Sequence, residues 1–109
     1  LNDHSTDIVD ETEKLLFLLK LDLELSSQHV ELANKIYITI KHLDLLLQVS
    51  PNILLYSTMC FLVHEIQQRD VCDIISEKYD VCKFTLIKNR ELILKEKNII
   101  YNYIKNEYI

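Results

Sequence analysis

The sequence contains no glycine and a single proline, Pro51, among its 109 residues. Glycine is the residue that tight turns with positive φ accept most easily, and two-residue β-hairpin turns depend on it. β-Sandwiches and other hairpin-rich folds are therefore disfavoured, and the sequence predicts an all-α fold. The same absence excludes the glycine-rich turns that hold phosphates in P-loops and in dinucleotide-binding folds.

Length and composition predict one globular domain over residues 1–109. Apolar residues make up 49% and charged residues 27% of the chain, which is ordinary for a soluble folded protein. The longest apolar run, residues 53–63, contains Ser57 and Thr58 and is too short to span a bilayer. No basic and apolar leader opens the chain, so we expect neither a secreted nor a membrane protein. Because the first residue is Leu1, we expect a piece of a longer protein.

Two helices are predicted before the proline. Apolar residues favour a first helix over residues 7–20. Residues 21–25 alternate apolar and acidic side chains, which locally resembles a strand, but no second strand is in sight to pair with it. We expect a connector there, with Leu23 and Leu25 directed inwards. Because serine accepts hydrogen bonds from the free amides at a helix start, Ser26 or Ser27 is expected to cap the second helix.

The sharpest local signal marks a third helix over about residues 51–67. Ser50 is a good N-cap, and Pro51 at the first helical position loses no hydrogen bond that the helix needs. Apolar side chains then surround the helix axis on nearly all sides, namely Ile53, Leu54, Leu55, Tyr56, Met59, Cys60, Phe61, Leu62, Val63 and Ile66. A helix that is apolar all round must be enclosed, so we expect this helix to lie centrally with the others around it.

A short helix follows, and then a turn. Asp70 is expected to cap a helix over residues 71–79. The inner face of this helix is expected to carry Val71, Ile74 and Ile75. Residues 80–83 read as a short turn, and the next helix begins near Lys83 or Phe84.

Helical spacing continues from there to the end of the chain without a breaker. Residues 83–109 therefore form either one long helix or two with a bend. We expect a domain core over residues 7–94 and a C-terminal helical extension over residues 95–109.

No metal, cofactor or catalytic site is indicated by residue spacing. The three cysteines have no zinc-ligand spacing, and the four histidines form no HExxH pattern. No serine or cysteine belongs to a motif that contains a general base. We therefore expect free thiols, no bound metal or cofactor, and no enzymatic activity. The residues considered are Cys60, Cys72, Cys82, His4, His29, His42 and His64.

The short helix, turn and following helix at residues 71–94 are similar to a helix-turn-helix. In that motif the early residues of the second helix face the bases of the major groove. Here those residues are Lys83, Phe84, Thr85, Ile87 and Lys88. Residues 83–109 hold six lysines and arginines against three glutamates, a charge of +3, whereas residues 1–34 hold two lysines against eight acids, a charge of −6. The basic end favours a polyanion, although the net charge of −5 opposes tight binding by the domain alone, and a plain helical corner has the same pattern.

The order of these signals resembles the second cyclin-like repeat of transcription factor IIB and its archaeal and viral relatives. The resemblance covers residues 13–93. It includes the leucine-rich run 15–19, a helix that closes at 42–45, Ser50-Pro51 before the enclosed helix, and Phe84-Thr85-Leu86 at the start of the last family helix. In that family a serine-proline opens the third, central helix, and a valine-threonine-isoleucine opens the fifth. No glycine precedes the serine-proline here, where the chain has Gln48-Val49.

The resemblance implies a five-helix cyclin fold with a central third helix, extended here at its C-terminus. It also implies a role in transcription initiation, in which the repeat binds TATA-box-binding protein and promoter DNA and helps to recruit RNA polymerase. The family's groove-reading valine and arginine fall on Phe84 and Ile87. Ile87 lacks the guanidinium that contacts guanine, whereas phosphate contacts by Lys83 and Lys88 remain available.

Two other interpretations stay open. One is a cyclin-box protein that binds a kinase or another protein partner, and the other is a helical oligomerisation or interaction module. Abundant isoleucine, lysine, asparagine and tyrosine hint at an A·T-rich source, such as a virus or a protozoan. We therefore expect a location in the nucleus or at a cytoplasmic viral replication site.

Overall fold

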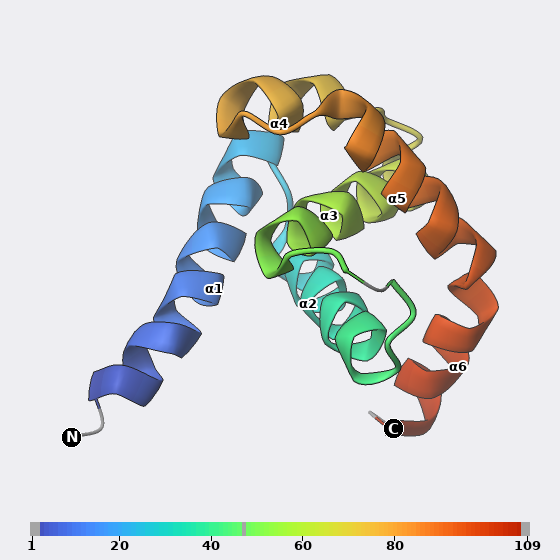
Figure 1. Ribbon diagram of the computed structural model, residues 1–109, viewed down its shortest axis with the longest axis horizontal. Coiled ribbons are helices and arrows are strands. Elements are labelled where there is room, and N and C mark those ends of the chain that lie inside the picture. The colour runs from blue at the N-terminus through green and yellow to red at the C-terminus, as the bar shows by residue number, and fades with distance from the viewer. Residues whose placement is uncertain (1–2, 47, 108–109) are drawn as a thin grey trace. The chain divides into compact units, whose positions relative to one another are not determined.

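A computed structural model describes residues 3–46 and 48–107, with side chains from residue 11 onward. This described part contains six helices and no strand (Figure 1), which confirms the all-α prediction. The helices are α1 (Asp3–Leu23), α2 (Ser27–His42), α3 (Pro51–Gln67), α4 (Cys72–Tyr79), α5 (Lys83–Lys95) and α6 (Lys97–Glu107). The chain forms two compact units, residues 1–32 and residues 33–109, with the boundary inside α2.

The turns adopt left-handed backbone conformations without any glycine. In the described part of the chain, the residues with positive φ are Glu24, Asp44, Gln48, Gln68 and Asp80, with φ between 50° and 61°. Each lies just after a helix or just before α3. For a residue with a Cβ atom, this conformation costs roughly 1–2 kcal/mol. The helix ends of this chain therefore carry local strain that glycine would relieve.

In the first unit, α1 is longer than the sequence predicts. It ends at Leu23, so part of the expected connector is helical. Glu24 then takes φ 54°, and the Leu25 amide donates to the Lys20 carbonyl at 2.9 Å. Leu23 and Leu25 are buried as expected. The alternating pattern therefore marked the end of a helix and its turn.

Both serine caps form where the sequence predicts them. The Ser26 Oγ accepts a hydrogen bond from the His29 amide at 3.1 Å, at the start of α2. The Ser50 Oγ accepts a long bond, 3.5 Å, from the Ile53 amide, and Pro51 occupies the first position of α3. The observed bounds of α3 match the predicted ones because its cap is encoded locally by two adjacent residues.

Between residues 54 and 63, α3 is buried around its whole circumference, as the sequence predicts, whereas Ile66 near its end is 39% exposed. Every residue from 54 to 63 is buried. The two hydroxyl side chains of this run form hydrogen bonds within the helix. The Ser57 hydroxyl donates to the Ile53 carbonyl at 2.7 Å, and the Thr58 hydroxyl donates to the Leu54 carbonyl at 2.8 Å. Burial of these hydroxyls therefore leaves no unpaired donor.

Within the second unit, α4, α5 and α6 follow one another beside α3 (Figure 1), and α5 forms the most extensive contact with it. Aromatic pairs and polar bonds join these helices. They are Tyr56 with Tyr79 (ring centroids 4.9 Å apart), Phe61 with Tyr101 (6.5 Å), Asn89 Nδ2 with Ser57 Oγ (3.1 Å) and Lys97 Nζ with Glu65 Oε1 (2.9 Å).

The prediction for the inner face of α4 is wrong at one position. Val71 and Ile75 are fully buried, but Ile74 is 45% exposed. Cys72, three residues before Ile75, is fully buried and occupies the inner place instead. A helix of eight residues turns only one narrow stripe inwards, and Ile74 lies off that stripe.

The C-terminal segment is two helices with a break between them. α5 ends at Lys95, and the Glu96 amide bonds to the carbonyls of both Leu92 and Ile93 at 3.3 and 3.0 Å. Such a shared bond is common where a helix tightens at its end. α6 then starts at Lys97 and buries Ile100. The chain bends here without proline or glycine.

Two adjacent glutamines test the strain at the end of α3. Gln68 has φ 50°, whereas Gln67 is the last helical residue. We expect Gln68→Gly to raise the free energy of unfolding by about 0.5–1 kcal/mol, because it removes the Cβ clash of the left-handed conformation. The control Gln67→Gly is expected to lower it by about 0.5–1 kcal/mol. Urea unfolding followed by circular dichroism measures both, and equal losses in the two variants would contradict the strain.

Candidate nucleic-acid interface

The predicted helix-turn-helix region is a compact corner between α4 and α5. Asp80, Val81 and Cys82 connect the two helices. Asp80 takes φ 54°, and the Val81 amide donates to the Ser76 carbonyl at 3.1 Å, while the Ser76 hydroxyl donates to the Val81 carbonyl. These bonds fix the direction in which α5 leaves the corner.

A half-buried arginine braces this corner from the α5 side. The Arg90 side chain is 14% exposed, and its Nη1 lies 3.5 Å from the Asp70 carboxylate and 3.7 Å from the Cys72 sulfur. Asp70 also accepts a hydrogen bond from the Cys72 amide at 2.9 Å. α4 starts at Cys72 with Val71 as its N-cap, one residue later than predicted, so Asp70 bonds to the first amide of α4 from the position before the N-cap. Arg90 ties that start to the middle of α5.

The two predicted DNA-contacting residues that are most accessible lie one turn apart on the outer face of α5. Phe84 is 79% exposed, and Lys88 is exposed four residues later. Thr85 and Ile87 are half-buried. Among the large apolar side chains that the structure describes, Phe84 is the most exposed, and it remains a candidate contact residue.

Lys83 is already engaged within the corner. Its Nζ lies 2.7 Å from the Asp73 carboxylate on α4. The hydrogen bond and the charge of Asp73 raise the pKa of the Lys83 ammonium. A phosphate that binds Lys83 therefore competes with Asp73, a contact that sequence reasoning missed because the two residues lie on different helices.

A shallow groove of about 500 Å³ lies beside α5 and brings two of the predicted residues together. α5 contributes Thr85, Lys88 and Asn89. The segment leading into α3 contributes Gln48 and Ser50, and the first turn of α3 contributes Ile53. Lys83, Phe84 and Ile87 are not part of its lining. The sequence alone gave no sign of this groove because its two walls are more than thirty residues apart along the chain.

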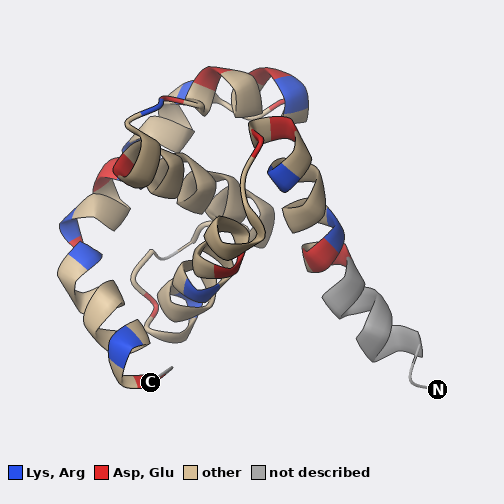
Figure 2. Ribbon diagram, turned by 180° about the vertical axis from the view of Figure 1, so that it is seen from behind, with Lys and Arg blue, Asp and Glu red and all other residues tan. Residues whose placement is uncertain are grey.

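The charge of this region is positive. Figure 2 shows lysine and arginine residues recurring along α5 and α6. The residues that line the groove include one cation, Lys88, and no acid. The first turn of α3 also contains no acidic residue. An anion in this groove would therefore meet no nearby repulsive carboxylate on its walls.

The cysteines are free thiols in the structure. Cys60 and Cys72 are buried, and burial is the main cause that raises the pKa of both thiols, which keeps them protonated. Cys82 is exposed at the start of α5, where hydrogen bonding to Thr85 lowers its pKa. Across residues 3–46 and 48–107, no cluster of three or more histidine, cysteine or acidic residues is arranged to hold a metal ion.

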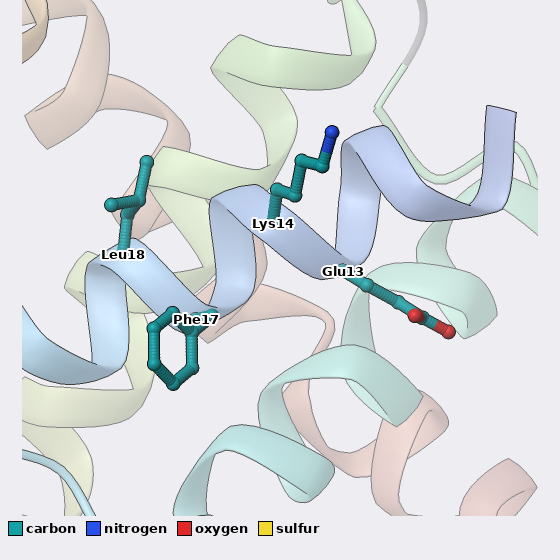
Figure 3. A pocket seen from close by; sticks show the side chains of 4 residues that line it. All are labelled: Glu13, Lys14, Phe17 and Leu18. Carbon is teal, nitrogen blue, oxygen red and sulfur yellow. The ribbon is translucent and has the colours of Figure 1, made fainter. Parts of the chain in front are cut away.

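A second depression, of about 530 Å³, lies along α1 (Figure 3). Its lining includes Phe17 and Leu18, which are 57% and 48% exposed, with Glu13 and Lys14 beside them. In Figure 3 Glu13 and Phe17 point to one side of the helix, and Lys14 and Leu18 to the other. Because the two charged groups diverge, they form no convergent binding site.

Comparisons with known proteins assign no family. A scan against protein-family models finds no match, and searches of curated proteins and of solved structures find no significant match. In the part of the chain that the structure describes, no helix combines the length and the apolar character that crossing a membrane requires.

The hydrogen bond that Asp70 accepts at the start of α4 predicts a pH dependence. The hydrogen bond from the Cys72 amide is the main cause that lowers the pKa of the Asp70 carboxyl, and Arg90 and Lys83 lower it further. Such a group stabilises the folded state above its unfolded pKa, about 3.9, and the contribution is lost as the pH falls through the lowered value. We expect Asp70→Asn to lower the free energy of unfolding by about 0.5–1 kcal/mol at pH 7.

The difference between wild type and Asp70→Asn should shrink as the pH falls below about 4, because the wild-type carboxyl then becomes neutral. Urea unfolding over a pH series measures it. Glu77→Gln, a change at an exposed residue of α4, serves as the control and is expected to stay close to wild type. A difference for Asp70→Asn that does not vary with pH would contradict the charge contribution.

Proposed function

We propose that this chain is the C-terminal cyclin-like repeat of a transcription initiation factor of the IIB type. In this role it binds TATA-box-binding protein and promoter DNA together and helps to recruit RNA polymerase. The observation that carries the proposal is the order of elements: a Ser50-Pro51 cap, a third helix buried on all sides over residues 54–63, and then a braced α4–α5 corner that presents Phe84 and Lys88 outwards. The proposed role is non-enzymatic, requires no cofactor, and is exercised in the nucleus or at a cytoplasmic viral replication site.

One backbone feature adds support. The family's pattern has a glycine just before the serine-proline, and this chain has Gln48-Val49 in that region. Gln48 takes φ 61°, a conformation that glycine adopts without strain. Gln48 lies two residues before Ser50, so a left-handed residue stands in the same region as the family's glycine.

The proposed DNA contact is mainly electrostatic. Lys88 is exposed and supplies a phosphate contact, and the Phe84 ring supplies an apolar surface for a thymine methyl group. Ile87 is half-buried and has no hydrogen-bond donor in its side chain, so it makes no bidentate contact to guanine. With a net charge of −5, the domain depends on TATA-box-binding protein for stable binding.

A gel-shift assay tests this function directly. The domain is expected to bind a TATA-containing duplex only when TATA-box-binding protein is present. Lys88→Glu should weaken the ternary complex about tenfold and make its salt dependence shallower by about one unit of slope, because one phosphate contact is lost. Lys105→Glu makes the same charge change at an exposed residue of α6 and is the matched control. Equal, negligible binding with and without the TATA-box-binding protein would refute the proposal.

The Lys83–Asp73 pair gives a second test, in which a substitution is expected to strengthen DNA binding. Asp73→Asn removes the carboxylate that holds Lys83 at 2.7 Å and frees the ammonium for a phosphate. We expect the affinity of the ternary complex to rise about two- to fivefold at low salt. Glu77→Gln makes the same charge change on α4 and should have less than half of this effect. Equal gains in the two variants would show a general charge effect instead of the release of Lys83.

A further inference from the structure

The groove beside α5 has a second wall that the proposed DNA contact does not use. Lys88 belongs both to the exposed face of α5 and to the lining of the groove. The opposite wall comes from the segment leading into α3, where Gln48 and Ser50 are exposed. A strand of nucleic acid that contacts Lys88 on the outer face of α5 therefore passes the mouth of this groove.

The chemistry of the lining fits a monoanionic oxygen group. The groove offers the Lys88 ammonium, the hydroxyls of Ser50 and Thr85, and the side-chain amide of Gln48 as hydrogen-bond donors. No acidic side chain lines it. Charge-assisted hydrogen bonds of this kind are stronger than neutral ones. A volume of about 500 Å³ is sufficient for a phosphodiester group with part of its sugar, and Ile53 supplies an apolar surface for the sugar.

We propose that one backbone phosphate of duplex DNA binds in this groove, so that the segment leading into α3 is a second DNA-contacting element beside α5. The inference rests on the proposed function and extends it to Gln48 and Ser50. Phosphate contacts position a protein on the duplex without reading sequence. Two walls that grip one phosphate therefore fix the register of α5, which compensates for the missing guanine contact at Ile87.

Charge substitutions in the groove wall test the inference in the ternary complex with TATA-box-binding protein. Gln48→Glu places a carboxylate opposite the phosphate and is expected to weaken binding about tenfold, whereas Gln48→Lys is expected to strengthen it about threefold. The control is Asn52→Glu, which makes the same charge change in the exposed first turn of α3 but does not line the groove. It is expected to change affinity less than twofold. Thermal melts check that each variant is folded.

A neutral substitution in the DNA locates the contact. A series of duplexes, each with one backbone phosphate replaced by a methylphosphonate, is measured with wild type and with Gln48→Glu. The inference expects one position at which the replacement weakens wild-type binding about tenfold and leaves the Gln48→Glu complex unchanged within twofold. This loss of sensitivity shows that Gln48 and that phosphate face each other.

The outcomes separate the two proposals. If wild type forms the ternary complex and loses affinity with Lys88→Glu, but Gln48→Glu behaves like Asn52→Glu, the phosphate groove is overturned and the proposed function stands. If every sensitive methylphosphonate position stays equally sensitive in Gln48→Glu, the groove is again overturned. If wild type forms no ternary complex, the proposed function itself fails, and the groove proposal fails with it.

Discussion

The burial of α3 on all sides between residues 54 and 63 is the constraint on which the second unit depends. A helix with ten consecutive buried residues has no face that can lie against water. Its Ser57 and Thr58 hydroxyls are tolerated because each bonds to a carbonyl one turn earlier. The neighbouring helices must therefore cover it. The face that each helix packs against α3 determines which of its residues point outwards.

α5 shows how this constraint reaches the candidate interface. Asn89 is buried and donates to Ser57 on α3, and Arg90 next to it holds the start of α4. These two adjacent contacts set the rotation of α5 about its axis. Because the helix is fixed in this rotation, Phe84 and Lys88 face outwards and Thr85 turns toward the groove. The outward face of α5 is therefore positioned by the contacts of Asn89 with Ser57 and of Arg90 with Asp70.

Locally encoded features could be predicted from the sequence, and features that depend on distant residues could not. The bounds of α3 follow from Ser50-Pro51, and its burial follows from its own apolar residues. The exposure of Ile74 depends on Cys72 taking the inner place, and the break at Glu96 occurs without a breaker residue. The groove joins segments around residues 48 and 88, so it exists only after folding, as does the pairing of Lys83 with Asp73.

The lack of glycine also affects the denatured chain. Without glycine, every residue carries a side chain that narrows the range of backbone conformations available after unfolding, so the entropy gained on unfolding is smaller. Part of the resistance of this domain to unfolding thus arises from the disordered ensemble and cannot be found among native contacts. The five residues with left-handed backbone conformation partly offset this stabilisation, since they are acidic and amide residues whose side chains disfavour that conformation.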